Sequence, residues 1–379
     1  MKMKEGSERR GQVPTWPFSS QTSISFNLFY KGIPINVITN SCEVRELEKR
    51  KISNTNIETS VIGLGTWAIG GDMWGGTDEQ QSIATIHAAL DKGITLIDTA
   101  PGYGFGRSEE IIGKALQQYN GKREDVVLAT KVGLNWKDGQ VYRDASKERI
   151  FKEIEDSLER LQTDYIDIYQ VHWPDPTVPI QETAEALNEL FEQGKIRAIG
   201  VSNFSIEQMN TFREYAPLHV VQPPYNLFER DIEEDVLPYV QKHQIHTLLY
   251  GSLCRGLLSG KMSVDKEFEG DDLRNHDPKF QEPRFSQYLK AVEELDELAK
   301  TKFNKSVLHI ALRFNIDQPG AGTALWGGRR PDQMDPVDQI SDFKIDEETQ
   351  REIDQILERN INDPVGPEFM APPDRTEIE

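Results

Sequence analysis

The stretch TLIDTAPGYGFG, residues 95–106, is a short apolar strand that runs directly into a loop carrying a carboxylate and a phenol. Asp98 ends the strand, and Tyr103 stands in the loop behind it. Two later apolar runs end in the same manner, one at Lys131 and the other at His172. Since the carboxyl ends of parallel strands lie at one edge of a sheet, the sequence predicts that these four side chains meet there.

Eight such strand candidates alternate with helical sequence. The expected strands are 61–67, 95–98, 126–131, 165–172, 196–201, 220–222, 247–250 and 323–326. This alternation implies a parallel sheet, and eight units predict an α/β protein with a closed (β/α)8 TIM barrel, whose active site lies at the C-terminal ends of the strands. An open doubly wound sheet is the alternative, but polar residues at so many strand ends favour the barrel.

Local signals mark helix starts and one unusual loop. Thr77–Gln80 and Ser205–Gln208 both have the pattern of a capping box, which predicts a helix start at each place. A long polar connection, about residues 251–284, follows the seventh strand. We interpret it as a lid or as a loop that clasps a cofactor, with a plain surface insertion as the alternative.

The composition limits the partners of the chain. Its 379 residues are 37% hydrophobic, which supports a sizeable core, and the formal net charge is -20. This charge argues against nucleic acid or an anionic membrane as a general partner, and no apolar run reaches the roughly 18 to 20 residues of a membrane span. We therefore expect a small-molecule partner and a monomer or weak homo-oligomer. The only cysteines, Cys42 and Cys254, give no disulfide framework and suit a reducing cytoplasm.

Residues 1–45 differ in composition from the rest. A charged start is followed by a Ser-, Thr- and Pro-rich part and then by the strand-like segment 24–30. From this composition we expect an N-terminal extension that is disordered or loosely packed, an appended hairpin, or a misassigned start. Its apolar part is too short for a signal-peptide core, so targeting is the minor alternative. Residues 46–379 are expected to form the barrel domain, including a C-terminal tail.

The strand-end residues suggest proton transfer. Tyr103 close to Asp98 is a candidate proton donor if a cation lowers the pKa of its phenol from about 10. Lys131 would supply that cation. A lysine at the end of a barrel strand is also a candidate Schiff-base nucleophile, so an aldolase is an alternative.

Two other patterns carry less weight. Gly102–Gly106 resembles a dinucleotide-binding loop, but its third glycine comes one residue early for the Rossmann pattern. His243 and His246 have a spacing seen in metal ligands, but no carboxylate or cysteine joins them at a recognised interval. We therefore expect no metal site.

The set Asp98, Tyr103, Lys131 and His172 resembles the catalytic tetrad of the aldo-keto reductases. Supporting motifs are GLGTW at 63–67, GVSNF at 200–204, VQPPYN at 221–226 and the segment 250–261. The motifs LCRGLL at 253–258 and DPVGPEFM at 363–370 are most similar to the bacterial general-stress NADP-dependent members. The resemblance extends from about residue 48 to the C-terminus.

The resemblance implies a cytoplasmic stress-response enzyme that reduces aldehydes, and some ketones, to alcohols by hydride transfer from NADPH. Tyr103 would be the general acid that gives a proton to the carbonyl oxygen. Lys131 would lower the pKa of the phenol, Asp98 would hold the ammonium, and His172 would orient the carbonyl.

The resemblance also implies contacts with NADP(H). The implied residues are Thr66, Trp67, Ser202, Asn203, Gln222, Tyr250, Ser252, Leu253, Arg255, Gly327, Arg329, Arg330 and Gln333. Asparagine and glutamine offer the paired donors and acceptors that a carboxamide needs, and two adjacent arginines suit a 2′-phosphate, which favours NADP(H) over NAD(H). Pro336–Val337 stands where the family often has a Glu-Asn pair, a departure at the adenine contacts.

Aromatic residues are the basis for the predicted substrate class. Trp67, Trp136 and Trp173 are expected on loops at the mouth, where they would line a pocket for aldehydes such as methylglyoxal, with ordinary packing as the alternative for each. By resemblance, Met370 and the tail would close one side of that pocket. An alternative function on the same fold is a nucleotide-sensing subunit, like the channel-associated proteins, whose bound cofactor reports redox state.

Overall fold

The structure, a computed structural model, describes residues 27–30, 33–36 and 47–378. Eight parallel strands close into a barrel in the order β5, β6, β7, β10, β11, β12, β13 and β14, and β14 pairs with β5. Their bounds are Ile62–Gly65, Leu96–Asp98, Val127–Val132, Ile168–Val171, Ile199–Ser202, Val220–Gln222, His246–Leu249 and Thr323–Gly327. Each strand overlaps one expected segment, so the predicted TIM barrel is confirmed and the open sheet is excluded.

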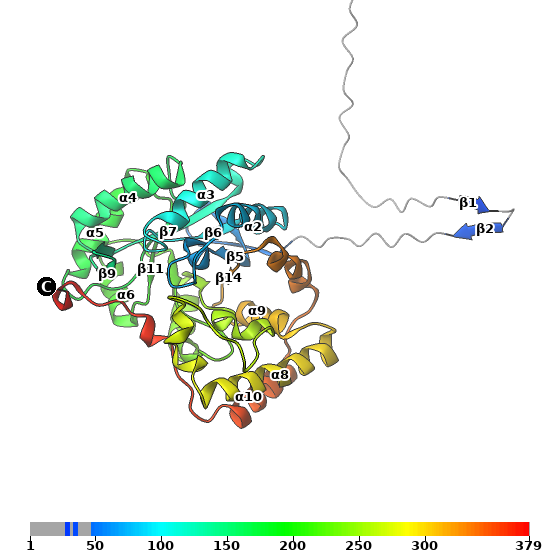
Figure 1. Cartoon of the computed structure of the whole chain (residues 1–379). Helices are drawn as coiled ribbons and strands as arrows, with labels where there is room; N and C mark the ends of the chain where they lie inside the picture. The colour runs from blue at the N-terminus through cyan, green and yellow to red at the C-terminus, as the bar shows by residue number, and fades with distance from the viewer. Residues whose placement is uncertain (1–26, 31–32, 37–46, 379) are drawn as a thin grey trace, which may run out of the picture. The chain divides into compact units, whose positions relative to one another are not determined.

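Helices alternate with these strands and surround the barrel (Figure 1). After the short α1 (Trp67–Gly70), they are α2 (Glu79–Asp91), α3 (Arg107–Gln118), α4 (Lys147–Leu161), α5 (Ile180–Glu192), α6 (Ile206–Arg213), α7 (Val236–His243), α8 (Arg284–Phe303), α9 (Val307–Asp317) and α10 (Glu347–Asn360). All eight strands run in one direction, so the loops after their carboxyl ends share one rim, which we call the mouth.

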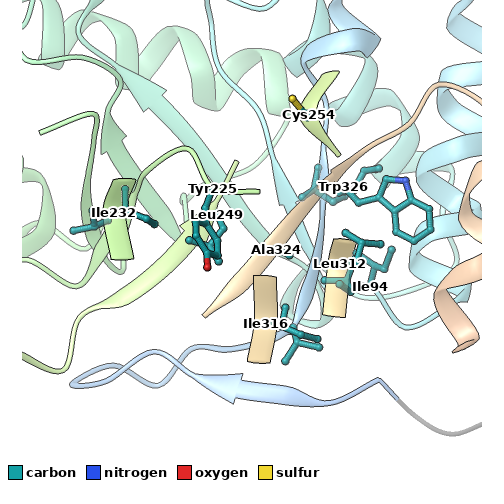
Figure 2. Packing of buried hydrophobic residues seen from close by; sticks show 14 of the residues in the cluster. Ile94, Tyr225, Ile232, Leu249, Cys254, Leu312, Ile316, Ala324 and Trp326 are labelled. Carbon is teal, nitrogen blue, oxygen red and sulfur yellow. The ribbon is translucent and has the colours of Figure 1, made fainter. Parts of the chain in front are cut away.

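The main apolar core lies between the barrel and the helices. Figure 2 shows part of it, in which Trp326 and Ala324 of β14 and Leu312 and Ile316 of α9 belong to one buried cluster. The Trp326 side chain is almost completely buried. Burying a side chain of this kind contributes about 1.5–3 kcal/mol or more, so the ring of helices fixes the strands that carry the polar residues.

Two hairpins of the barrel unit were not expected from the sequence. In the first, β3 (Lys49–Lys51) pairs with β4 (Glu58–Ser60), and Ile52 packs in the barrel interior near the amino ends of the strands. In the second, β8 (Leu134–Lys137) pairs with β9 (Gln140–Arg143) directly after β7. The first closes the end of the barrel away from the mouth, and the second adds to the mouth.

The start of α2 differs by one residue from the prediction. Asp78, not Thr77, is the N-cap, and its carboxylate accepts from the Gln81 amide at 2.9 Å. Aspartate is at least as good an acceptor as threonine at this position, which explains the shift. The predicted capping box of Ser205 and Gln208 is confirmed at the start of α6.

The long connection after β13 contains the short 3-10 turns η3 (Cys254–Ser259), η4 (Leu273–Asn275) and η5 (Pro278–Phe280). Separately, β1 (Asn27–Tyr30) pairs antiparallel with β2 (Ile33–Asn36). The rest of the expectation for residues 1–45 lies outside the described residues. Among the helices of the described ranges, none has the length and apolar character needed to cross a bilayer.

Candidate active site

The four polar residues at the strand ends lie together. Lys131 of β7 donates from Nζ to Asp98 Oδ1 at 2.7 Å, to the Thr99 carbonyl oxygen at 2.9 Å and to the Tyr103 hydroxyl at 3.2 Å. The side chains of Lys131 and Asp98 are 0% and 3% exposed. The ring of His172 meets the Tyr103 ring edge-on, with centroids 5.7 Å apart. One buried ammonium thus joins a carboxylate and a phenol beside an imidazole.

Burial decides the titration of these groups. It raises the pKa of Tyr103 above 10, although the nearby Lys131 ammonium opposes part of the shift. Lys131 thus lowers the pKa of the phenol as expected, but the cost of burying a phenolate is larger, so the pKa stays above 10. Burial would lower the pKa of Lys131, but Asp98 and Tyr103 together raise it. Burial, assisted by Lys131, lowers the pKa of His172 well below 6.5, so the imidazole is neutral at neutral pH.

Residues of the loop after β5 hold Tyr103, which itself lies in the loop after β6. Gly104 has a φ of +65°, and a Cβ there would come within 2.3 Å of the Gly70 carbonyl oxygen, so this position requires glycine. The Trp67 ring stacks on the Tyr103 ring at 5.9 Å with an interplanar angle of 20°. Thr66 donates from Oγ1 to the Asp98 carbonyl oxygen at 2.8 Å. The phenol is therefore held by aromatic and backbone contacts as well as by Lys131.

Four residues assigned to the nicotinamide by resemblance form a chain that leads to Asp98. The Tyr250 hydroxyl donates to Asn203 Oδ1 at 2.9 Å, and Asn203 Nδ2 donates to Ser202 Oγ at 3.1 Å. Ser202 donates to the Gln222 carbonyl oxygen at 2.7 Å, and Gln222 Nε2 donates to Asp98 Oδ2 at 2.8 Å. The ends of β11, β12 and β13 are thereby tied to the end of β6.

The long loop after β13 begins with buried residues. Ser252 is fully buried, and Leu253 packs against the core. The guanidinium of Arg255 pairs with Glu229 at 2.6 Å and also with Asp277. These ion pairs use the donors that the resemblance assigns to the cofactor, and they tie the start of the loop to η5.

Beyond β14, one glutamine side chain organises two arginines. Gln333 Oε1 accepts from the backbone amides of Arg329 at 2.7 Å and Arg330 at 3.0 Å. The Arg329 side chain donates to the Trp74 carbonyl oxygen at 2.8 Å, whereas the Arg330 side chain is 50% exposed. Gly327 ends the strand and is exposed. The loops after β5 and β14 therefore meet at Arg329, with a second cation beside it.

The three tryptophans considered for the substrate have different surroundings. Trp67 stacks on the tetrad phenol, as described above. Trp136, on β8, meets Phe105 edge-on at 5.7 Å. The guanidinium of Arg143 lies 5.7 Å from the Trp173 ring centroid. Trp67 is thus in direct contact with the tetrad, while Trp136 and Trp173 are tied to the β8–β9 hairpin.

Three further contributions were missed in the sequence. Gln170 of β10 donates from Nε2 to Asp98 Oδ2 at 3.4 Å, and its signal was a lone amide in an otherwise apolar strand. Trp74 packs edge-on against the tryptophan that begins α1, at 5.6 Å. Arg143 donates to the Pro372 carbonyl oxygen at 2.8 Å, which brings the C-terminal segment to the hairpin. No sequence pattern predicted the contacts of Trp74 and Arg143.

The two histidines once considered for a metal are accounted for by other contacts. His246 begins β13, is buried and lies 3.1 Å from the Thr323 hydroxyl. The His243 ring packs on the Tyr239 ring at 4.4 Å. Among residues 47–378, no three His, Cys, Asp or Glu side chains are grouped as metal ligands would be.

Comparison with known proteins shows the family of this chain. The model of the Aldo/keto reductase family matches residues 61–358. The chain is 66% identical to the aldo-keto reductase YhdN of Bacillus subtilis, over 88% of this chain and 100% of that protein. It is 36% identical to the NADH-specific methylglyoxal reductase of Escherichia coli, over 76% of this chain and 91% of that protein.

Solved structures are similar as well. The glycerol dehydrogenase of Gluconobacter oxydans has a TM-score of 0.77 at 51% identity, with 85% of this chain and 99% of that chain covered. An aldo/keto reductase from Klebsiella pneumoniae, solved in complex with NADP and acetate, has a TM-score of 0.61 at 29% identity, with 79% and 92% covered.

Proposed function

The chain belongs to the aldo/keto reductase family of oxidoreductases, and on that premise we propose that it reduces aldehydes, and some ketones, to alcohols with NADPH. The observation that carries the proposal is the Tyr103 hydroxyl at 3.2 Å from an ammonium that is itself paired with Asp98 at 2.7 Å. This is the arrangement that a phenol needs to act as a general acid in a buried site.

Each tetrad residue has a distinct task in this proposal. Tyr103 donates its proton to the carbonyl oxygen as negative charge develops there, and the Lys131 ammonium stabilises the phenolate that remains. Asp98 keeps Lys131 protonated and in place. The imidazole of His172 is neutral at pH 7 because its pKa is depressed, so it donates a hydrogen bond to the carbonyl without giving up a proton.

The donor set at the mouth fits a nicotinamide dinucleotide. When bound, the reduced nicotinamide supplies the hydride that the carbonyl carbon receives. Near the tetrad the residues proposed to hold it are Thr66, Trp67, Ser202, Asn203, Gln222 and Tyr250. Toward the adenosine end they are Ser252, Leu253, Gly327, Arg329, Arg330 and Gln333. Arg255 is also proposed as a contact near the pyrophosphate, and its ion pairs with two carboxylates hold the start of the loop in place.

The choice between NADP(H) and NAD(H) rests on two arginines. The backbone amides of Arg329 and Arg330 both donate to Gln333 Oε1. These bonds fix the backbone from which the two arginine side chains extend. Forked guanidinium groups suit a 2′-phosphate. The relative from Klebsiella pneumoniae was solved with NADP, while the one from Escherichia coli is named NADH-specific. The two adjacent cations favour NADPH here.

We propose small oxygenated aldehydes as substrates. The relatives are named for methylglyoxal and for glycerol, both molecules of three carbons with neighbouring oxygen functions. Trp67 beside the phenol, with Trp136 and Trp173 further out, would provide apolar walls of a pocket for such molecules. Methylglyoxal and glyceraldehyde are therefore the first substrates to test.

The test is NADPH oxidation by purified protein with methylglyoxal and with glyceraldehyde, repeated with NADH. Tyr103→Phe should retain NADPH binding and lose about 10²–10⁴-fold in kcat, because a general acid contributes that much. Tyr215→Phe is the matched control, since Tyr215 is an exposed tyrosine that follows the end of α6 and lies outside the tetrad. Equal loss in both variants, or full activity in Tyr103→Phe, would refute Tyr103 as the acid.

The other functions considered for this fold give different outcomes. An aldolase needs a neutral lysine, and the raised pKa of Lys131 counts against that chemistry. Borohydride trapping of a carbonyl on Lys131 would support it. A nucleotide-sensing protein would bind NADPH and show a single slow oxidation without steady-state turnover.

We further propose a cytoplasmic setting, a role in the stress response, and a monomer or weak homo-oligomer. The low cysteine content supports the first. The basis for the second is the resemblance of the segments 253–258 and 363–370 to those of the general-stress members of the family. Light scattering on the purified protein measures the third directly, and a stable higher oligomer would overturn it.

A further inference from the structure

Asp98 is held on both of its carboxylate oxygens. Oδ1 accepts from Lys131, while Oδ2 accepts from Gln222 Nε2 at 2.8 Å and from Gln170 Nε2 at 3.4 Å. Gln222 Nε2 also donates to Gln170 Oε1 at 3.3 Å. The carboxylate and the two glutamines therefore form a closed ring of three hydrogen bonds inside the barrel.

The barrel has room for Gln170 to reach this ring. Gln170 stands opposite Lys131 of β7 on one side and opposite Gly200 of β11 on the other. A Cβ at Gly200 would come within 2.7 Å of Gln170 Cγ. Since the glycine has no side chain, Gln170 is able to extend toward Gln222 and Asp98.

An amide at this depth needs an explanation. Gln170 is completely buried, and a buried amide costs free energy unless its donor and acceptor are both bonded. An apolar side chain of the same volume would pack without that cost. The side-chain hydrogen bonds of Gln170 go to Asp98 and Gln222, so its polarity is explained by the tetrad and not by packing.

We propose that Gln170 is a positioning residue for the reaction: it fixes Oδ2 of Asp98, so that Oδ1 stays aimed at Lys131 and Lys131 stays against Tyr103. This inference rests on the proposed function for its effect on turnover. Its effect on the phenol holds whether or not a substrate is turned over.

The direction of the effect follows from the charges around Tyr103. The groups that face it are Lys131 from β7, Asp98 from β6, His172 after β10 and Tyr250 after β13. Loss of a donor to Oδ2 leaves more negative charge on Asp98 and lets the carboxylate turn away from Lys131. Both changes make the Tyr103 phenolate harder to form.

The first experiment replaces the amide by an apolar side chain of similar length, Gln170→Met. Tyrosine labelled with ¹³C at Cζ is followed by NMR over alkaline pH, and Tyr103 is assigned with Tyr103→Phe. We expect its titration to move upward by about half to one pH unit, and kcat to fall by about 3- to 10-fold. The KM for NADPH should change less than kcat does, because Gln170 would affect the cofactor only through its hydrogen bond to Gln222.

The second experiment is Gln170→Glu, which keeps the reach of the side chain. When protonated, the new carboxyl donates to Asp98 as the amide did, and when ionised it repels Asp98. The ratio of variant kcat to wild-type kcat should therefore rise as pH falls. An apolar substitution gives a ratio without this pH dependence.

Tyr169→Phe is the matched control on the same strand. Tyr169 is buried, and its hydroxyl has no hydrogen-bond partner in the described part of the chain. The proposal is overturned if Gln170→Met moves the Tyr103 titration no further than Tyr169→Phe does, or if the Gln170→Glu ratio is flat with pH. If the wild type turns over no carbonyl, the proposed function fails, and the NMR titration alone decides the role of Gln170.

Discussion

We predict that Lys279→Met destabilises the protein far more than the loss of an exposed lysine would. Lys279 Nζ contacts Glu229 Oε1 at 2.8 Å and donates to the backbone oxygens of Val365 and Gly366, the latter at 3.2 Å. Its side chain is 0% exposed. The same Glu229 pairs with Arg255. One lysine therefore joins η5, the start of the long loop and the C-terminal segment.

The magnitude follows from the charge balance of this buried cluster. Arg255 and Lys279 offset Glu229 and Asp277, all of them nearly inaccessible to solvent. Removing one cation leaves a surplus negative charge with no water to stabilise it. Breaking a buried ion pair in this way costs about 3–5 kcal/mol of unfolding free energy.

The assay is urea unfolding followed by tryptophan fluorescence, with Lys147→Met as the control. Lys147 pairs with Glu189 at 2.7 Å, but the two side chains are 55% and 45% exposed. An exposed pair contributes about 0–1 kcal/mol, so the two lysine variants should differ by at least about 2 kcal/mol. Equal unfolding midpoints would refute the reasoning.

Acid stability gives an independent check of the same cluster. Burial alone would raise the pKa of Glu229, but Arg255 and Lys279 lower it below 4.5. A group with a depressed folded-state pKa stabilises the fold above its unfolded pKa, and that stability is lost as pH falls through the folded value. Lys279→Met removes one of the cations, so acid unfolding should begin at higher pH than in the wild type.

Three further outcomes are expected. Arg329→Ala should raise the KM for NADPH about 10- to 100-fold and leave the KM for NADH nearly unchanged, as steady-state kinetics with both cofactors would reveal, because one charge-assisted contact to a phosphate is lost. His172→Gln should lower kcat without changing the shape of its profile between about pH 6 and 8, since the imidazole is already neutral there; a wild-type inflection near 6.5 that vanishes in the variant would contradict this. Deleting residues 371–379 removes the Arg375 contacts to Asp144 at 3.1 Å and to Asp175 at 3.2 Å. This deletion should raise the KM for the carbonyl several-fold, while the affinity for NADPH, measured by fluorescence, stays the same.

The barrel and the meeting of the tetrad were readable from the sequence for a physical reason. Parallel strands covered on both faces are continuous apolar runs, so a polar residue such as Asp98 or Lys131 at the end of one is conspicuous. Once eight such runs are counted, barrel closure brings their ends to one rim. The approach of Lys131 to Tyr103 follows from that closure and needs no knowledge of side-chain packing.

The features that the sequence did not predict are side-chain contacts for which more than one partner is available. A threonine and an aspartate stand next to each other before α2, and only geometry decides that Asp78 caps the helix. The sequence expectation for Tyr103 considered the cation and left out burial, which acts in the opposite direction and is larger. Gln170 was a lone amide in an apolar strand, but the sequence did not indicate its partners, which lie on β6 and β12, far away in the chain.

The contacts around the mouth have one consequence for ligand binding. Arg329 donates to backbone oxygens of Trp74 and Gly76, and Asp271 accepts from the amides of Met73 and Gly75. These bonds join the loop after β5 to the loops after β13 and β14. A dinucleotide that engages Arg329 through Nη1 exchanges these backbone carbonyl acceptors for a phosphate oxygen. A phosphate carries charge and a carbonyl does not, so this exchange favours a cofactor with the extra phosphate over one without it.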